Sequence, residues 1–127
     1  MKFIKKFYEI NAPIDKVWDG LINPDSINKW GGGPSRMNDE EGFEFKLWGG
    51  DVFGKNIKVI KEKLLTQEWF GGDWDKPSIV TFNLKTANGK TVVELIHTDV
   101  PDKEVKDIEQ GWGDYYMLPL KKLVEQT

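Results

Sequence analysis

Two residue types that build many enzyme and metal sites are almost missing from this sequence, which contains no cysteine and a single histidine, His97. Without cysteine the chain cannot form disulfide bonds or thiolate metal sites. A typical zinc site takes three or four protein ligands, and one histidine without cysteine cannot supply such a set. The sequence therefore predicts no metal centre.

Long apolar runs are also missing. No stretch approaches the ~18 consecutive apolar residues that a membrane-spanning helix requires. The N-terminal segment, MKFIKKFYEI, is positively charged but lacks the apolar core of a signal peptide. The net charge is −3 and both signs are interspersed, so the sequence has no basic surface for nucleic acid or anionic lipid. We expect a cytoplasmic protein that binds neither nucleic acid nor membranes.

Aromatic side chains, by contrast, are abundant: the 127 residues include six Trp, seven Phe and three Tyr. A chain of this length suits a single domain, so residues 1–127 are expected to share one core. Aromatic side chains dominate both protein cores and binding surfaces, because each buries roughly 150–250 Å². The question for function is therefore which aromatic residues belong to the core and which bind a partner.

The start of the chain predicts a strand followed by two short helices. Residues 2–11 are rich in Phe, Ile and Tyr, as strands are. Pro13 suits the first turn of a helix. The apolar residues of that helix recur on one face, at Ile14, Val17, Trp18 and Leu21. A second short helix begins after its cap, Asn23, and buries Ile27 and Trp30.

Beyond residue 42 the hydrophobic period changes to two, which predicts antiparallel strands. Apolar and polar residues alternate within segments 43–47, 57–59 and 80–84, residues 93, 95 and 97 share one face, and segment 65–70 also resembles a strand. Asn88-Gly89, between the last two predicted strands, is typical of a two-residue hairpin turn because both residues tolerate a positive φ.

Residues 102–125 form the longest predicted helix, with one wide apolar stripe. The stripe consists of Val105, Ile108, Trp112, Tyr116, Pro119, Leu120 and Leu123. We expect Pro119 to kink the axis, because proline lacks the N–H that a helix interior needs. The whole order predicts an α+β fold in which this helix lies across one face of a single sheet.

Several segments resemble one known family when they are taken in order. Residues 12–18 (APIDKVW) resemble the family's opening helix, AP-x-x-x-V-W, and residues 23–30 its second helix with a closing Trp. Residues 45–54 are similar to its first hairpin, and residues 68–74 (EWFGGDW) to its aromatic strand end and loop. Residues 111–116 (GWGDYY) resemble the GW-x-x-YY of its last helix.

These segments resemble the START-like (helix-grip, Bet v 1-like) superfamily and, within it, the C-terminal domain of the activator of the 90-kDa heat-shock protein ATPase. The resemblance implies a curved antiparallel sheet wrapped around a long C-terminal helix, with two short helices after the first strand. It also implies that residues 1–127 make one domain of this type.

No group of residues in the sequence points to catalysis. A catalytic base needs a nucleophile and a further group that orients it. The available serines all lie beside turn or helix-start signals, at Ser26, Ser35 and Ser78. Glu44 and Glu94 alternate with apolar residues and so face water, and residues 31–36 lack the Lys-Ser/Thr ending of a phosphate loop. We predict a protein without enzymatic activity and without a cofactor.

Two functions of different classes follow, and the first is the binding of a small molecule. A cavity between the sheet and the long helix would hold an apolar or aromatic molecule, which His97 and the tyrosine hydroxyls orient. The predicted lining of this cavity is Phe45, Phe82, Leu95, His97, Trp112 and Tyr116. The alternative, that large side chains fill the gap completely, stays open at this point.

The second function is that of a co-chaperone in the stress response. The resemblance implies binding to a 90-kDa heat-shock chaperone and stimulation of its ATPase. Trp69, Phe70 and Trp74 lie beside a glycine-rich loop and are the predicted exposed protein-binding patch.

Overall fold

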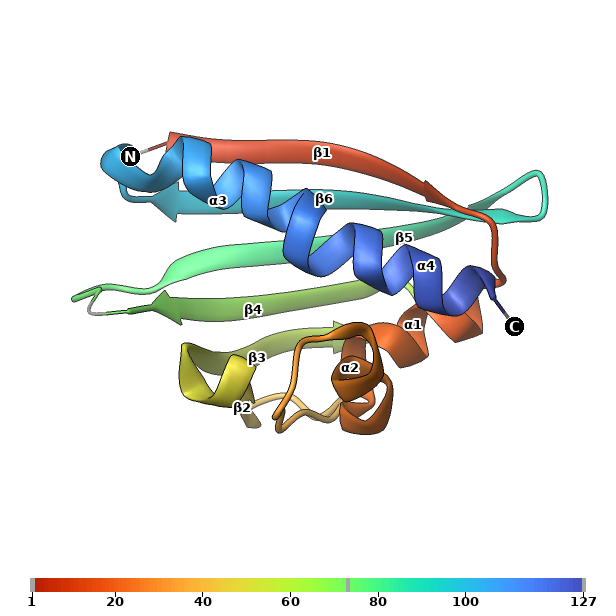
Figure 1. Ribbon diagram of the computed structural model, residues 1–127, viewed down its shortest axis with the longest axis horizontal. Helices are drawn as coiled ribbons and strands as arrows, with labels where there is room; N and C mark the ends of the chain where they lie inside the picture. Colours follow the sequence, from red (N-terminus) through yellow and green to blue (C-terminus); the bar gives the residue numbers. More distant parts are fainter. Residues whose placement is uncertain (1, 73, 127) are drawn as a thin grey trace.

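The computed structural model describes residues 2–72 and 74–126. These residues form an antiparallel sheet that is covered by helices on one face (Figure 1). The strands are β1 (Lys2–Ile10), β2 (Glu44–Leu47), β3 (Val52–Ile60), β4 (Leu64–Gly71), β5 (Ser78–Ala87) and β6 (Lys90–Val100). Their order in the sheet is β1-β6-β5-β4-β3-β2, so the first strand pairs with the last. The predicted α+β helix-grip architecture is confirmed.

Two short helices, α1 (Ile14–Ile22) and α2 (Pro24–Trp30), follow β1 as predicted. Asn23 begins the second helix, because its side-chain oxygen accepts a hydrogen bond of 2.9 Å from the N–H of Asp25. Gly31 ends it in the left-handed region, at φ 108°. The indole of Trp30 donates to the Gly20 carbonyl at 2.9 Å, which ties α2 to α1.

The C-terminal helix runs as one rod across the sheet, from η2 (Asp102–Glu104) through α3 (Val105–Gly111) and η3 (Trp112–Met117) to α4 (Leu118–Glu125) (Figure 1). The η3 segment is π-helical, and its last bond runs from the Leu118 N–H to the Gly113 carbonyl, five residues back. Pro119 follows directly, in the first turn of α4. In place of the expected kink, the helix widens into a π-helical turn just before the proline. None of the described helices is long and apolar enough to cross a membrane.

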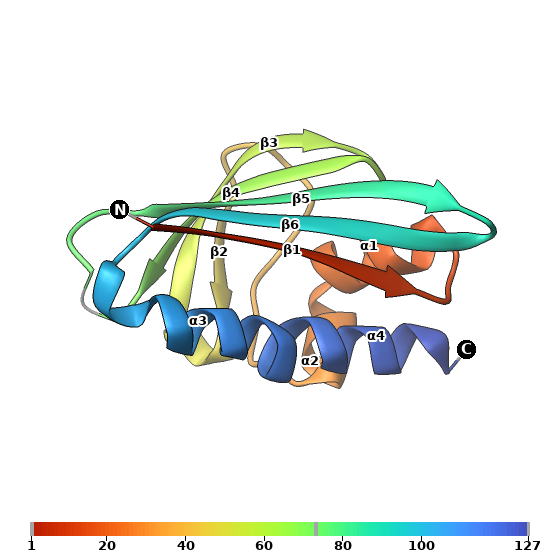
Figure 2. The same cartoon turned by 90° about the horizontal axis from the view of Figure 1, so that it is seen from above.

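Figure 2 shows the sheet and the C-terminal helix as two layers, with β2 and the start of β3 curving down to the level of the helix. The turn between these strands is η1 (Trp48–Gly50). Alternate residues of β4, β5 and β6 face the helix and are buried, as the period of two predicts. The core therefore lies between the inner face of the sheet and the buried stripe of the helix.

The structure corrects the sequence prediction for β3. Segment 57–59 was expected to alternate regularly, but the register with β4 shifts between Asn56 and Lys58. Ile57 is the extra residue of this bulge and is 42% exposed, whereas Asn56 is buried. The bulge leaves Ile57 on the outer face, and a sequence pattern alone does not reveal it.

The predicted hairpin turn at Asn88-Gly89 is confirmed. Ala87 pairs with Lys90 across it. Asn88 and Gly89 both have a positive φ, 54° and 77°, as a turn of this type requires. This turn joins β5 to β6, two of the strands that face the middle of the C-terminal helix.

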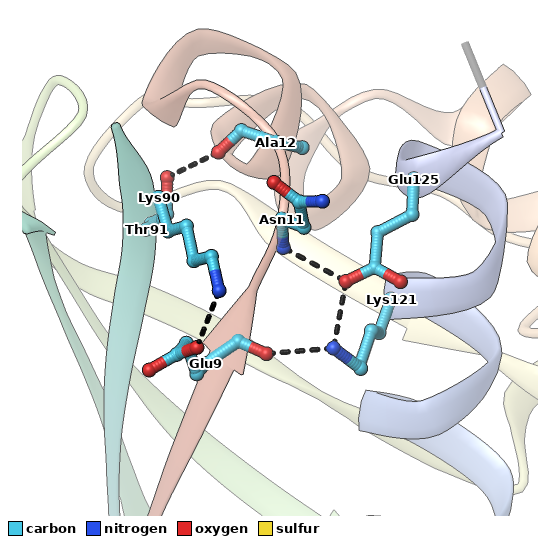
Figure 3. Close-up of polar contacts among 7 residues, drawn as sticks. All are labelled: Glu9, Asn11, Ala12, Lys90, Thr91, Lys121 and Glu125. Atoms are coloured by element: carbon cyan, nitrogen blue, oxygen red, sulfur yellow. Dashed lines mark hydrogen bonds and ion pairs between the residues drawn. The ribbon is translucent and has the colours of Figure 1, made fainter. Parts of the chain in front are cut away.

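The far end of the C-terminal helix is fastened to the end of β1 by the contacts in Figure 3. Lys121 donates to the Glu9 carbonyl at 2.8 Å and pairs with Glu125 at 2.6 Å. Glu125 also accepts the backbone N–H of Asn11 at 2.8 Å. The hydrogen bond from Lys121, with that from Asn11, holds the pKa of Glu125 below its usual value. These contacts set the position of α4 along the sheet.

Gly54 in β3 provides a test of how closely the strands approach. A Cβ at this position would lie 1.7 Å from the Glu68 carbonyl oxygen and 3.2 Å from the ring of Phe45. Since backbone must move to admit it, Gly54→Ala should lower the free energy of unfolding by about 3 kcal/mol. Urea denaturation measures the change, with Gly111→Ala as a control whose Cβ meets only Tyr115, at 3.7 Å. Equal stability of Gly54→Ala and the unsubstituted protein would contradict this packing.

Candidate functional site

Aromatic side chains fill the middle of the space between the sheet and the C-terminal helix. Trp112 and Tyr116 lie one turn apart on the helix, with ring centroids 4.9 Å apart. Both contact Phe82 of β5, at 5.7 Å each. Trp69 of β4 packs against Trp112 at 4.7 Å, and all four residues are buried. The helix is therefore attached to the sheet by a continuous aromatic cluster.

A cavity of about 440 Å³ lies beside this cluster, where the first half of the C-terminal helix faces η1. Its wall consists of Trp48, Asp51, Trp69, Asp107, Ile108, Gly111, Trp112, Tyr115 and Tyr116. The volume falls within the roughly 300–1,000 Å³ that is usual for small-molecule sites. The cavity thus occupies one end of the gap and not its whole length.

The structure brings the six predicted lining residues together but gives them two different positions. Trp112 and Tyr116 form part of the cavity wall. The other four are buried in the core behind it, and they are Phe45, Phe82, Leu95 and His97. These four lie outside the cavity wall, because the aromatic rings of the sheet and the helix are large enough to fill the central part of the gap.

His97 is 1% exposed, and both nitrogens of its ring have partners. The indole N–H of Trp112 donates to His97 Nδ1 at 2.9 Å. This leaves the proton on Nε2, which donates to Ser78 Oγ at 2.7 Å. The Ser78 hydroxyl in turn donates to the Trp69 carbonyl at 3.1 Å. His97 therefore holds Trp112 in place and has no free nitrogen to offer a ligand.

The contact between His97 and Ser78 was not foreseen from the sequence, and it has the wrong polarity for catalysis. A general base must accept the proton of its serine, but here Nδ1 is occupied by Trp112 and Nε2 carries the proton. Ser78 is also fully buried. Among residues 2–72 and 74–126, no three His, Asp or Glu side chains converge as a metal site requires.

A second buried chain of hydrogen bonds orients Trp69. Its indole N–H donates to Gln67 Oε1 at 2.8 Å, and the Gln67 amide donates to Asn56 Oδ1 at 2.9 Å. Asn56, which lies opposite Gln67 on β3, donates to the carbonyls of Asn38 and Glu40 at 2.9 and 3.1 Å. This buried amide is thus fully paired and supports the cavity wall.

Trp48 forms the opposite wall and was missed as a site residue. Its backbone is left-handed, at φ 49°, which is unfavourable for a tryptophan. The Trp48 N–H donates to the Gly32 carbonyl at 2.8 Å, and the next N–H, of Gly49, donates to Pro34 at 2.9 Å. The half-buried indole packs edge-on against Tyr116, with centroids 6.3 Å apart. A sequence signal existed, since Trp48 directly precedes the turn residues Gly49-Gly50-Asp51.

The predicted protein-binding patch does not form one surface. Trp69 and Phe70 are neighbours on a strand, so their side chains point to opposite faces of the sheet. Trp69 is 7% exposed and faces the helix, which corrects the expectation that it is exposed. Phe70 lies on the outer face, stacked on Phe53 at 5.2 Å. Trp74 lies in the loop after β4, and its indole donates to Glu104 at 2.7 Å.

The buried histidine makes the stability of the protein depend on pH. Burial lowers the pKa of His97 to about 4, whereas an unfolded chain titrates near 6.5. The unfolded state therefore binds more protons between these values, and stability falls as the pH falls from 6.5 to 4. The expected loss from pH 7 to pH 4 is roughly 3 kcal/mol from this group.

Urea denaturation of the unsubstituted protein and of His97→Gln across this pH range isolates the effect, because other titrating groups cancel in the difference. His97→Gln is expected to be less stable at pH 7 and to lose the part of the pH dependence of stability that His97 causes. Parallel pH profiles of the two proteins would contradict a buried, neutral His97.

Comparisons with known proteins agree with this fold. The model of the family described as "Activator of Hsp90 ATPase homolog 1-like protein" matches residues 11–125, which confirms the resemblance seen in the sequence. The "Activator of 90 kDa heat shock protein ATPase homolog" of Dictyostelium discoideum is 30% identical over 105 residues, which cover 80% of this chain and 27% of that protein. The chain spans 27–36% of the length of the curated relatives that it matches.

Solved structures show the same architecture. An HSP90 activator from Plasmodium falciparum superposes with a TM-score of 0.87 at 16% identity, over 97% of this chain and 96% of that one. The Aha1 dimer from Colwellia psychrerythraea gives a TM-score of 0.86 at 22% identity, over 98% of this chain and 97% of that one. At these identities the likeness establishes the fold.

Proposed function

Because this chain belongs to the family of Activator of Hsp90 ATPase homolog 1-like proteins, we propose that it acts by binding and not by catalysis, and that its cavity holds an apolar or aromatic small molecule. The observation that carries this proposal is the cavity of about 440 Å³ between η1 and the C-terminal helix. Its wall is built mainly of large aromatic side chains, which is the usual composition of small-molecule sites.

The rigidity of the wall supports the proposal. Trp112 is held by His97, Trp69 is held by Gln67, and Trp48 is fixed by backbone bonds to the loop after α2. A ligand that enters such a site does not have to order these side chains, so little of its binding energy is lost. An open, preformed aromatic cavity is expected to bind flat or compact apolar molecules.

Gly111 allows the cavity to be closed from within the helix. It lines the cavity, and a Cβ there makes only an ordinary contact with Tyr115, at 3.7 Å. Gly111→Ala should therefore stabilise the helix by about 0.5–1 kcal/mol, and Gly111→Met should place its side chain in the cavity. Aromatic compounds that raise the Tm of the unsubstituted protein in a thermal-shift screen should lose that effect with Gly111→Met.

Gly113→Ala is the matched control, because Gly113 lies on the same helix, outside the cavity wall, and its Cβ would approach only Tyr8 Oη, at 4.0 Å. Compounds should still bind this variant. Binding that is equally strong in Gly111→Met would place the ligand elsewhere, and a screen without any binding compound would contradict the proposal.

A second candidate is the co-chaperone function, which the names of the relatives favour: the Dictyostelium discoideum protein is called an activator of the 90 kDa heat shock protein ATPase. Of the predicted patch, Phe70 lies on the outer face, where it stacks on Phe53. Trp74 lies in the loop after β4 and bonds to Glu104. Phe53 is 41% exposed, so apolar surface is available on the outer face.

An ATPase assay with a 90-kDa heat-shock chaperone tests this candidate. The protein should raise the ATPase rate, and Phe70→Ala and Trp74→Ala should weaken the effect severalfold, since buried aromatic residues dominate protein interfaces. Phe7→Ala is the control, because Phe7 is equally aromatic and 63% exposed but lies on β1, at the opposite edge of the sheet. If saturating concentrations of the protein do not stimulate the ATPase, the co-chaperone function is contradicted.

A further inference from the structure

The charged residues of the cavity wall are both acidic. Asp51 follows η1, and Asp107 lies in the first turn of α3, so the carboxylates come from opposite sides of the cavity. The wall contains no lysine, arginine or histidine. Within the described part of the chain, neither carboxylate forms an ion pair with a basic side chain. The two negative charges are therefore available to a ligand.

The remaining wall is rich in π-electron faces. Three indoles and two phenol rings line the cavity, and they belong to Trp48, Trp69, Trp112, Tyr115 and Tyr116. The face of an aromatic ring carries a negative potential, which attracts ammonium groups within about 6 Å of its centre. Tyr115 is 68% exposed, so one of these rings stands at the rim, in water. Rings and carboxylates thus favour the same sign of ligand charge.

Tyr116 contributes its ring to the cavity wall. It lines the cavity and is 1% exposed, yet its hydroxyl has no hydrogen-bond partner. A buried hydroxyl without a partner is costly, and such groups are rare in folded proteins. The hydroxyl is enclosed in the core, so a ligand meets the ring of Tyr116 and not its oxygen. A purely apolar occupant would make no use of the two carboxylates, and an anion would be repelled by them.

We infer that the cavity selects organic cations: an ammonium group attached to an aromatic or other compact apolar body. The apolar body packs against the indoles, and the positive charge lies among the ring faces and the carboxylates of Asp51 and Asp107. This inference rests on the proposed function, since it names the class of molecule that the same cavity binds.

Three probes with the same apolar body separate the contributions of charge and shape. Phenyltrimethylammonium carries a positive charge, tert-butylbenzene is its neutral isostere, and benzoate is an anion of similar size. Binding is followed by quenching of tryptophan fluorescence at pH 7 in low salt. The cation should bind roughly 10-fold more tightly than the neutral isostere, as cation–π and ionic contributions together predict, and benzoate should bind most weakly.

Charge-removing variants locate the effect. Asp51→Asn and Asp107→Asn should each weaken cation binding roughly 3-fold or more and leave the affinity for tert-butylbenzene unchanged. Asp15→Asn removes the same charge from α1, outside the cavity wall, and should leave both affinities unchanged. Gly111→Met should abolish binding of both probes.

The possible failures are distinguishable. If tert-butylbenzene binds as tightly as the cation, or if Asp51→Asn and Asp107→Asn leave cation binding unchanged, the inferred selectivity is wrong while the proposed function stands. Tighter binding of benzoate than of the cation would also contradict the inferred selectivity and leave the proposed function standing. If none of the three probes binds, the proposed function fails and the inference fails with it.

Discussion

The hydrogen bond from the Trp112 indole to His97 is the contact on which the rest of this structure depends. Both groups are buried, so loss of either partner would leave a polar atom unpaired, at a cost of about 1–3 kcal/mol. His97 lies on β6, and its other nitrogen reaches Ser78 at the start of β5. Ser78 continues the chain to the Trp69 carbonyl on β4. One line of donors and acceptors therefore crosses three strands and positions the helix over them.

This contact, together with the packing at the other end of the helix, determines where the cavity lies. Along α4 the helix meets α1 closely, since a Cβ on Gly20 would come within 3.2 Å of Leu120. Lys121 and Glu125 hold that end to β1 (Figure 3). The first half of the helix has no such helical neighbour, so the curved strands and η1 supply its opposite wall (Figure 2). The space that remains is found there and not along the middle of the helix.

Sequence periodicity predicts the elements of this fold well because each burial pattern follows directly from helix or strand geometry. It places Val93, Leu95 and His97 on one face of β6, and the structure agrees. The same alternation separates Trp69 from Phe70, so treating these adjacent residues as one exposed patch neglected the geometry of the strand.

Other features depend on interactions between distant segments, which periodicity does not contain. The bulge at Ile57 follows from the pairing of β3 with β4, and the buried Asn56 is satisfied only because the loop before β2 supplies two carbonyls. Whether the gap is full or empty depends on summed side-chain volumes. A list of residues that face the gap does not separate Trp112 and Tyr116, which line the cavity, from Phe82 and Leu95, which lie in the packed core.

The cavity wall includes several features that stability alone would not favour. Trp48 holds a left-handed backbone, which costs of order 1–3 kcal/mol and is retained by bonds to the loop after α2. Tyr116 buries a hydroxyl without a partner, and Asp51 and Asp107 place negative charge beside aromatic faces. Among the described residues, two further buried groups without a partner lie outside the cavity wall, the Tyr8 hydroxyl and the Trp18 indole nitrogen, whereas buried side chains such as Gln67 are paired. Local departures of this kind concentrate at binding sites, because the interaction that compensates for them comes from the ligand. At the cavity the strained Trp48 and the two carboxylates belong to one aromatic wall, which favours a binding site over a packing defect.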